Sequence, residues 1–514
     1  MYIKCAGYFA QDGFPESSFL LPASKNLASD RRVFMPKTIF GTTEKSNFIL
    51  NMNKSTVRKW VAGLLCACVI VPLLGGIFIT AVPGTSALLG TFLYATGFSC
   101  ILFYIVLLLR KDIRLMDYRC AYFIFGLAAL AVASYYRVVI ANADYQEAVS
   151  TALLGENGRY EGLLALLAYF GIFLLASAVM SRSSVRIIFD ILIGAGIVQG
   201  IVAVMQHIPW GFPSDFRKLP ALLLLKDVHL SSGLSDSPIF YGSFLTLVTG
   251  IAAAGAMYEK NIVRARVYGV SAVFFFLTGL FTSSVIPLIG TGSVFVILTV
   301  IEFTAGKSGT VFEEGALKSS RKRLAAMLIG IAAVLGLVLA FQGIWLRDKA
   351  IAYTDCFYRL YITGDPSPVN NDSLWKIGAE RSFIIIKEHP VLGIGPDLMA
   401  KYQTSAGELL TDSIDRSYNE YLYIAATRGI PSLAVYIALL GASLVRLFRN
   451  VREFASDREK WFRPALLTAL TAYSVQAFFS VSAVTVAPFF WLLLGMSWSE
   501  LADDKPYKSG KQKK

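Results

Sequence analysis

Residues 415–420 combine charged side chains with a pattern typical of the start of a helix. Asp415 and Arg416 precede Ser417, and Ser417 with Glu420 has the spacing of a capping box. Free backbone N–H groups, the positive end of a helix dipole and a guanidinium together favour a bound anion. Two interpretations follow: an anion-binding helix start, or an ordinary capped surface helix.

A second helix is expected just upstream, before the sequence HPVLGIGPD at 389–397. Pro390 should end this helix, and the glycines that follow it should form a turn. Either of two residues could cap its N-terminus, Asp372 or Ser373. We expect the helix to lie across the mouth of a helical bundle and to bury three apolar residues against it, namely Leu374, Ile377 and Ile384.

The composition predicts an all-α polytopic membrane protein. Hydrophobic residues make up 55% of the 514 residues and charged residues only 16%, against roughly 25% in soluble domains. Uncharged runs of about 20 residues recur, and each could cross a bilayer as a helix. About twelve spans are expected, near 60–81, 87–109, 120–140, 161–180, 187–206, 239–257, 267–282, 285–303, 324–344, 429–447, 464–481 and 484–500.

The net charge of +13 is concentrated in alternate loops between the expected spans, which indicates membrane topology and not a nucleic-acid partner. The positive-inside rule places the basic loops and both termini in the cytoplasm, and 345–428 outside. The expected location of the protein is a bacterial inner membrane. The expected organisation is an extension that is disordered or wrongly assigned (1–51), spans 1–9 (52–344), the outer loop (345–428), spans 10–12 (429–500) and a basic cytoplasmic tail (501–514).

Metal ligands and cofactor motifs are not evident in the sequence. The three histidines are scattered, and the six cysteines lack the spacing of a zinc site. Cys66, Cys68 and Cys100 lie in apolar runs and are interpreted as small packing residues, whereas Cys356 is expected to be a lone thiol in the outer loop. We therefore expect no metal and no cofactor.

Several stretches, taken in order, resemble the superfamily of O-antigen ligases and Wzy-type O-antigen polymerases. The resemblance covers nearly the whole chain from about residue 52 and places a long outer loop before the third-last span. The stretches are GRYEGLLALLAY (158–169), QHIPWGFP (206–213), SSGLSDSPIFYGSFL (231–245), WKIGAERSFIIIKEHPVLGIGPD (375–397), DRSYNEYLYIAATRGIPSLAVYIALL (415–440) and AYSVQAFFSVSAVTVAPFFWLLLG (472–495).

The resemblance implies a GT-C-like membrane glycosyltransferase in polysaccharide biosynthesis at the cell envelope. Such enzymes transfer a glycan from an undecaprenyl-pyrophosphate carrier to an acceptor sugar, outside the cytoplasm and without a metal ion. Bidentate arginines suit the departing diphosphate, and a carboxylate suits the acceptor hydroxyl. The residues expected to bind substrate are Arg159, Glu161, Arg217, Arg381 and Arg416, and those expected to be catalytic are Asp415, Tyr418, Asn419 and Glu420.

Two departures from the family pattern leave other functions open. Tyr418 stands where the family often has a histidine, and the 282–290 segment lacks an arginine that the family often has. Tyrosine is a poor base at neutral pH, so Asp415 or Glu420 is expected to act as the base, and Arg217 or Arg137 to supply the missing positive charge. The alternatives are a transporter or flippase of lipid-linked oligosaccharide, or an inactive family member.

Overall fold

The computed structural model describes residues 54–81, 86–110, 118–141, 146–156, 159–178, 180–207, 231–235, 237–282, 284–307, 319–337, 374–402, 416–456, 461–499 and 501–502. The chain divides by its contacts into residues 1–47 and 48–514, and everything below concerns the second unit. The expected extension at 1–51, the caps at Asp372 or Ser373, and Cys356 lie outside the described residues.

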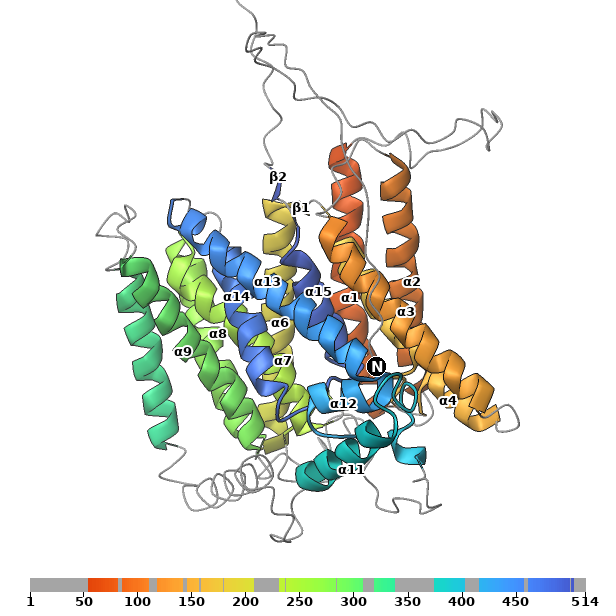
Figure 1. Cartoon of the computed structure of the whole chain (residues 1–514). Coiled ribbons are helices and arrows are strands. Elements are labelled where there is room, and N and C mark those ends of the chain that lie inside the picture. Colours follow the sequence, from red (N-terminus) through yellow and green to blue (C-terminus); the bar gives the residue numbers. More distant parts are fainter. Residues whose placement is uncertain are drawn as a thin grey trace, which may run out of the picture. The chain divides into compact units, whose positions relative to one another are not determined.

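The described part of the chain is almost entirely helical (Figure 1). Two strands of two residues each, β1 (Met180–Ser181) and β2 (Leu501–Ala502), pair in parallel. The helices are α1 (Lys54–Ala81), α2 (Ser86–Arg110), α3 (Tyr118–Ala141), α4 (Gln146–Leu154), α5 (Leu163–Ala176), α6 (Arg182–His207), α7 (Pro238–Tyr258), α8 (Ile262–Leu280), α9 (Val285–Lys307), a helix over 319–337, α11 (Leu374–Glu388), the 3-10 turn η3 (Met399–Lys401), α12 (Glu420–Arg428), α13 (Ile430–Ser456), α14 (Phe462–Gln476) and α15 (Ala487–Met496).

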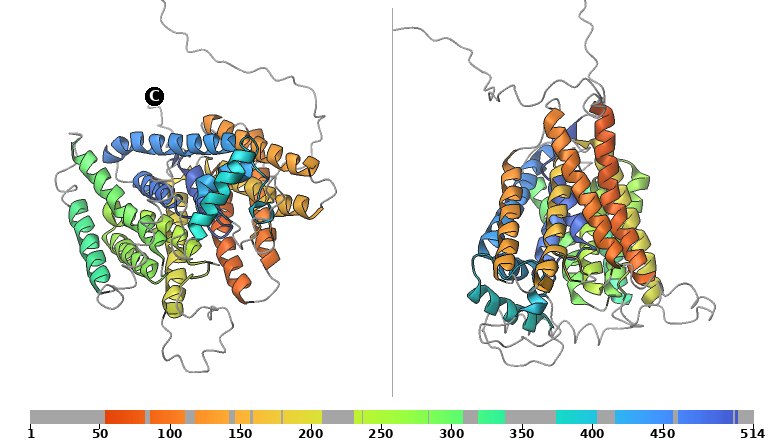
Figure 2. Two further views of the ribbon diagram at one scale, coloured as in Figure 1. Left: turned by 60° about the horizontal axis from the view of Figure 1, so that its bottom comes forward. Right: turned by 90° about the vertical axis from the view of Figure 1, so that its right-hand side faces the viewer.

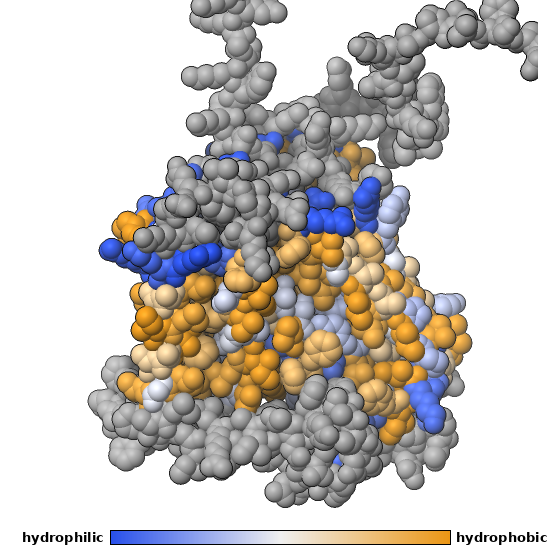
Figure 3. All heavy atoms as spheres, turned by 60° about the vertical axis from the view of Figure 1, so that its left-hand side comes forward, coloured by the Kyte–Doolittle hydropathy of each residue, from blue (hydrophilic) through white to orange (hydrophobic). Residues whose placement is uncertain are grey.

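Seven of the described helices are long and apolar enough to cross a membrane, which makes the chain a membrane protein with several spans. They are α2, α3, α6, α7, α8, α9 and α13. Each of the twelve expected ranges overlaps a described helix, but the number twelve remains a prediction. Figure 3 shows hydrophobic side chains over the middle of one face of the molecule and hydrophilic ones along its upper edge.

Three apolar helices, α5, α14 and α15, contain only 14, 15 and 10 residues. Every residue of α15 is buried, as are most of those in α5 and α14. A helix enclosed by protein does not have to match the thickness of the bilayer, because neighbouring segments can satisfy the backbone beyond its ends. These short helices are therefore compatible with a position inside the bundle.

Helices α11 and α12 lie at one end of the bundle, where α12 contacts α3, α11 and α13 (Figures 1 and 2). As predicted, α11 ends at Glu388, two residues before Pro390. The predicted buried stripe of α11 is wrong: Ile377 and Ile384 are exposed, and the side chain of Leu374 lies outside the described residues. The face that packs inward instead carries Lys376, Ala379, Arg381, Ser382 and Ile385.

Gly378 explains this reversal of faces. A Cβ atom built on Gly378 would lie 2.5 Å from the carbonyl oxygen of Arg416, so only glycine permits this approach of the two backbones. The contact turns the polar side of α11 toward the segment that leads into α12. Arg381 lies three residues further along the same helix and is buried. The orientation of α11 is thus set by its packing against 416–417 and not by burial of its apolar stripe.

Candidate functional site

Asp397 is the centre of a contact between two loops that are far apart in the sequence. Its Oδ1 lies 2.8 Å from Nη2 of Arg159, and its Oδ2 accepts a hydrogen bond from the backbone N–H of Glu156 at 2.7 Å. The hydroxyl of Tyr423 on α12 donates to Oδ1 at 3.4 Å. Asp397 is fully buried and has a φ of +56°, a left-handed conformation that aspartate adopts more readily than most residues. One carboxylate therefore holds both loops and α12 together.

A second ion pair lies beside the first. Nη2 of Arg416 is 3.4 Å from Oε1 of Glu161, and both side chains are more than nine-tenths buried. The guanidinium of Arg416 also covers the ring of Phe240 at the start of α7, 4.7 Å from its centroid. The structure thus places Arg159, Glu161 and Arg416, three of the residues expected to bind substrate, in two neighbouring ion pairs.

The start of α12 differs from the predicted capping box. The N-cap is Asn419, whose side chain accepts a hydrogen bond from the N–H of Leu422 at 3.1 Å. Ser417 donates its hydroxyl to the carbonyl of Asn419 at 3.1 Å and does not cap the helix. The backbone N–H of Glu420 donates to the carbonyl of Ala477 at 2.9 Å. The N–H groups of Glu420 and Leu422, which were expected to bind an anion, therefore already donate to protein oxygens. An anion at this site would have to be bound by the arginines.

The carboxylate of Glu420 connects α12 to two helices of the bundle. Its oxygens accept hydrogen bonds from the hydroxyls of Tyr436 on α13, at 2.6 Å, and Tyr473 on α14, at 3.0 Å. Tyr473 in turn stacks on Phe490 of α15, with ring centroids 4.5 Å apart. Burial raises the pKa of Glu420, and the two hydroxyls and the charge of Arg428 oppose this effect. With both oxygens engaged, Glu420 is better placed to position α12 than to act as the base.

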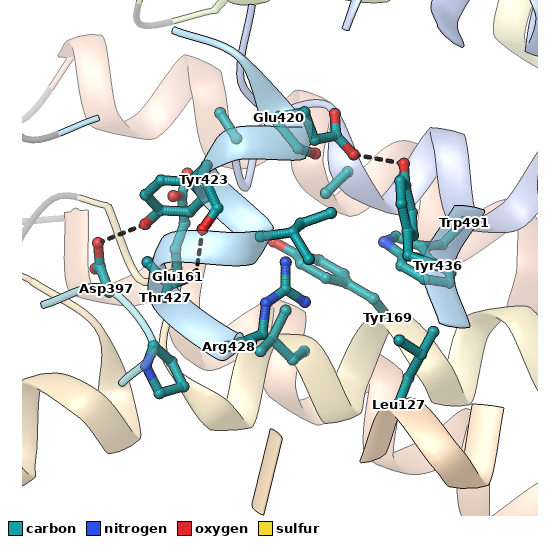
Figure 4. A pocket seen from close by; sticks show the side chains of 16 residues that line it. Leu127, Glu161, Tyr169, Asp397, Glu420, Tyr423, Thr427, Arg428, Tyr436 and Trp491 are labelled. Carbon is teal, nitrogen blue, oxygen red and sulfur yellow. Dashed lines mark hydrogen bonds between the residues drawn. The ribbon is translucent and has the colours of Figure 1, made fainter. Parts of the chain in front are cut away.

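Behind α12 is a cavity of about 50 Å³, large enough for a few water molecules (Figure 4). Glu161, Asp397 and Glu420 all line it, so the cavity joins the two ion pairs to the buried carboxylate. Arg428 and Tyr169 also point into it (Figure 4). Burial lowers the pKa of Arg428, although Tyr423 and Glu420 oppose this, and the guanidinium stays charged.

The other end of α12 is fixed by the turn at 390–395. The N–H groups of Ile394 and Gly395 donate to the carbonyls of Ala426 and Thr427, at 3.0 and 2.9 Å. Arg137 on α3 donates to the carbonyl of Gly393, and its Nη2 lies 3.2 Å from Nδ1 of His389. Arginine can only donate, so Nδ1 of His389 accepts this hydrogen bond. Arg137 therefore connects α3 to the turn that holds the end of α12.

The remaining predicted residues have different outcomes. Tyr418 is half-buried directly before the cap, with a φ of +48°. Arg381 is buried on α11, and Asp415 and Arg217 lie outside the described residues. Within the part of the chain that the structure describes, no group of His, Cys, Asp or Glu side chains could hold a metal ion.

Three residues of this site, Asp397, Tyr423 and Arg428, were not predicted from the sequence. Asp397 ends the GIGPD turn, and an acidic residue after a glycine-rich turn was a usable signal. Tyr423 and Arg428 had no such signal, because only the direction of α12 reveals what they contact.

Comparisons with known proteins add no identification. No protein-family model, no curated protein and no solved structure matches this chain.

Proposed function

We propose that this chain is a membrane glycosyltransferase that moves a glycan from an undecaprenyl-pyrophosphate carrier to an acceptor sugar, as an O-antigen ligase or polymerase does. The observation that carries the proposal is the pair of arginines, Arg159 and Arg416, whose side chains are only 11% and 9% exposed and which lie with two carboxylates at one end of an apolar bundle. A lipid-linked diphosphate would occupy such a place, with its charge at the arginines and its chain in the bilayer. The site would face the outside of a bacterial inner membrane, with both chain termini in the cytoplasm.

The proposed chemistry needs positive charge at the leaving group and a base at the acceptor. Two guanidiniums can bind the diphosphate in a bidentate way and stabilise the charge that grows on it as the sugar–phosphate bond breaks. Glu161 is then released from Arg416, and its carboxylate acts as the base that accepts the proton of the acceptor hydroxyl. The hydroxyl oxygen forms the new glycosidic bond, and the diphosphate leaves with the electron pair of the broken bond.

The other predicted residues then position the helices and the acceptor without taking part in the bond changes. Asn419 caps α12, and Glu420 fixes the same end of that helix to α13 and α14. Arg381 lies buried on the helix that packs against 416–417. Tyr418, in place of the histidine common in the resembling family, would orient the acceptor through its hydroxyl without removing a proton.

Purified protein in nanodiscs, supplied with a defined undecaprenyl-pyrophosphate oligosaccharide and an acceptor glycan, tests the proposal. We expect glycan transfer by the native chain and a loss of at least 100-fold on Arg416→Gln. Arg449→Gln removes an exposed arginine from the second half of α13, away from the end that follows α12, and should leave the rate unchanged. Absence of transfer by folded native protein with a range of donors would overturn the proposal.

Translocation of the same lipid is the second candidate, and one observation favours it. Inside the bundle, Gln476 accepts a hydrogen bond from Thr246 at 2.5 Å and donates to Ser243 at 3.1 Å, and Ser243 contacts Ser480 at 3.1 Å. Buried polar groups in membrane helices often mark a transport path. A fluorescent lipid-linked donor distinguishes the two functions: movement between leaflets without glycan transfer would favour the transporter, and neither activity would favour an inactive relative.

A further inference from the structure

A large apolar groove lies between α8 and the helix over 319–337, away from the two ion pairs. Its volume is about 620 Å³, within the range of sites that hold small ligands. Ten of its twelve lining residues are uncharged, and the two charged ones are Arg266 and Arg323. The groove thus combines a long apolar wall with guanidiniums, which is the chemistry of a lipid-binding site.

The basic residues of the two helices gather at one end of this groove. Neither α8 nor 319–337 contains an aspartate or a glutamate, and their first five residues include Arg264, Arg266, Arg321, Lys322 and Arg323. Two carboxylates lie beside these helix starts: that of Glu302 accepts a hydrogen bond from Ser320 at 2.6 Å, and that of Glu259 accepts one from the N–H of Asn261 at 3.1 Å. Five basic side chains against two carboxylates leave an excess of positive charge, which favours an anion at this end of the groove.

One of the arginines is held in place by the bundle itself. Nη1 of Arg323 donates to the carbonyl of Glu259 at 2.9 Å and to that of Ala256 at 3.2 Å, at the C-terminal end of α7. Arg266, by contrast, is exposed on α8. Both helices begin at the end of the bundle opposite α11 and α12 (Figure 1). Figure 3 shows hydrophilic side chains along one edge of the apolar face on this side of the molecule.

We infer that the groove between α8 and 319–337 binds an anionic phospholipid, with the phosphate at Arg266 and an acyl chain along Gly269, Val270 and Phe274. A bilayer supplies this ligand, and basic pockets between membrane helices are known to recognise such headgroups. The inference does not depend on the proposed glycosyltransferase function, because it concerns the opposite end of the bundle and different residues.

Native mass spectrometry of the full chain, with phosphatidylglycerol and phosphatidylcholine added in equal amounts, tests the inference. We expect selective retention of phosphatidylglycerol by the native protein. Arg266→Gln should weaken this retention about fivefold, since one basic residue near an anionic lipid contributes roughly 1 kcal/mol. Gly269→Phe should reduce it further, because a Cβ at Gly269 meets only Ala256 at 3.5 Å and Met327 at 4.0 Å, so the larger side chain fills the groove.

Arg449→Gln is the matched control, since it removes an exposed arginine from α13, which does not line the groove. Retention should be unchanged in this variant. An equal loss in Arg449→Gln and Arg266→Gln would show a diffuse effect of charge and overturn the site. Full retention by folded Gly269→Phe, or no preference for phosphatidylglycerol in the native protein, would overturn it as well.

Discussion

Arg159 and Asp397 form an ion pair at 2.8 Å between two loops that are 238 residues apart in the sequence. The aspartate side chain is fully buried, and that of the arginine is 11% exposed. A charge pair in this environment stabilises the fold only while both members are present, because removal of one leaves the other uncompensated. The pair therefore connects the fold to the proposed binding site.

Asp397→Asn should destabilise the protein by about 3 to 5 kcal/mol, since it removes the buried carboxylate that lies 2.8 Å from the guanidinium of Arg159. Thermal unfolding in detergent measures this loss. Glu147→Gln is the control: its carboxylate contacts Lys401 at 2.8 Å but is 62% exposed, and such pairs contribute about 1 kcal/mol or less. Equal effects of the two substitutions would contradict the role given to Asp397.

Glu420 should make stability depend on pH. Burial raises its pKa in the folded state, so the folded protein binds the proton more tightly than the unfolded chain does. This contribution is fully present below the unfolded pKa of about 4.3 and is lost as the pH rises through the folded pKa. The native protein should therefore lose stability relative to Glu420→Gln as the pH rises above the unfolded pKa. A difference between the two unfolding temperatures that does not change with rising pH would contradict the prediction.

Gly429 should tolerate no side chain. Its φ is +86°, and a Cβ would lie 2.0 Å from the carbonyl oxygen of Val391. Gly429→Ala should therefore separate the 390–395 turn from α12 and reduce the yield of monodisperse protein in size-exclusion chromatography. Gly441→Ala on α13 is the control, because a Cβ there meets nothing within 4 Å and alanine favours a helix by about 1 kcal/mol. Normal yield and activity of Gly429→Ala would show that the turn is not needed.

Local chemistry in the sequence predicted some elements well. Pro390 fixed the end of α11, and apolar runs located the helices that could cross a membrane. A helix was predicted to begin just after Ser417, whereas α12 begins at Glu420 with Asn419 as its cap. Both residues suit a cap, and only the path of the preceding segment decides between them.

Contacts between distant segments could not be predicted from local patterns. The approach of Gly378 to Arg416 reverses the buried face of α11, and no periodicity in α11 shows it. The tyrosines that donate to Glu420 come from α13 and α14, and Asp397 pairs with Arg159 from a segment 238 residues away in the sequence. Pairing across the fold therefore determines the site, whereas the sequence shows only which residues are available.

Binding of a polyprenyl diphosphate tests the central claim most directly. Farnesyl diphosphate, which is soluble enough for calorimetry, should bind the native protein more tightly than farnesyl monophosphate. Arg159→Gln and Arg416→Gln should each weaken the binding of the diphosphate at least 10-fold, since a hydrogen bond to a charged group contributes about 1.5 to 3 kcal/mol. Arg449→Gln should bind as the native protein does. Equal affinity for the two ligands, or native affinity in both of the first two variants, would contradict the account.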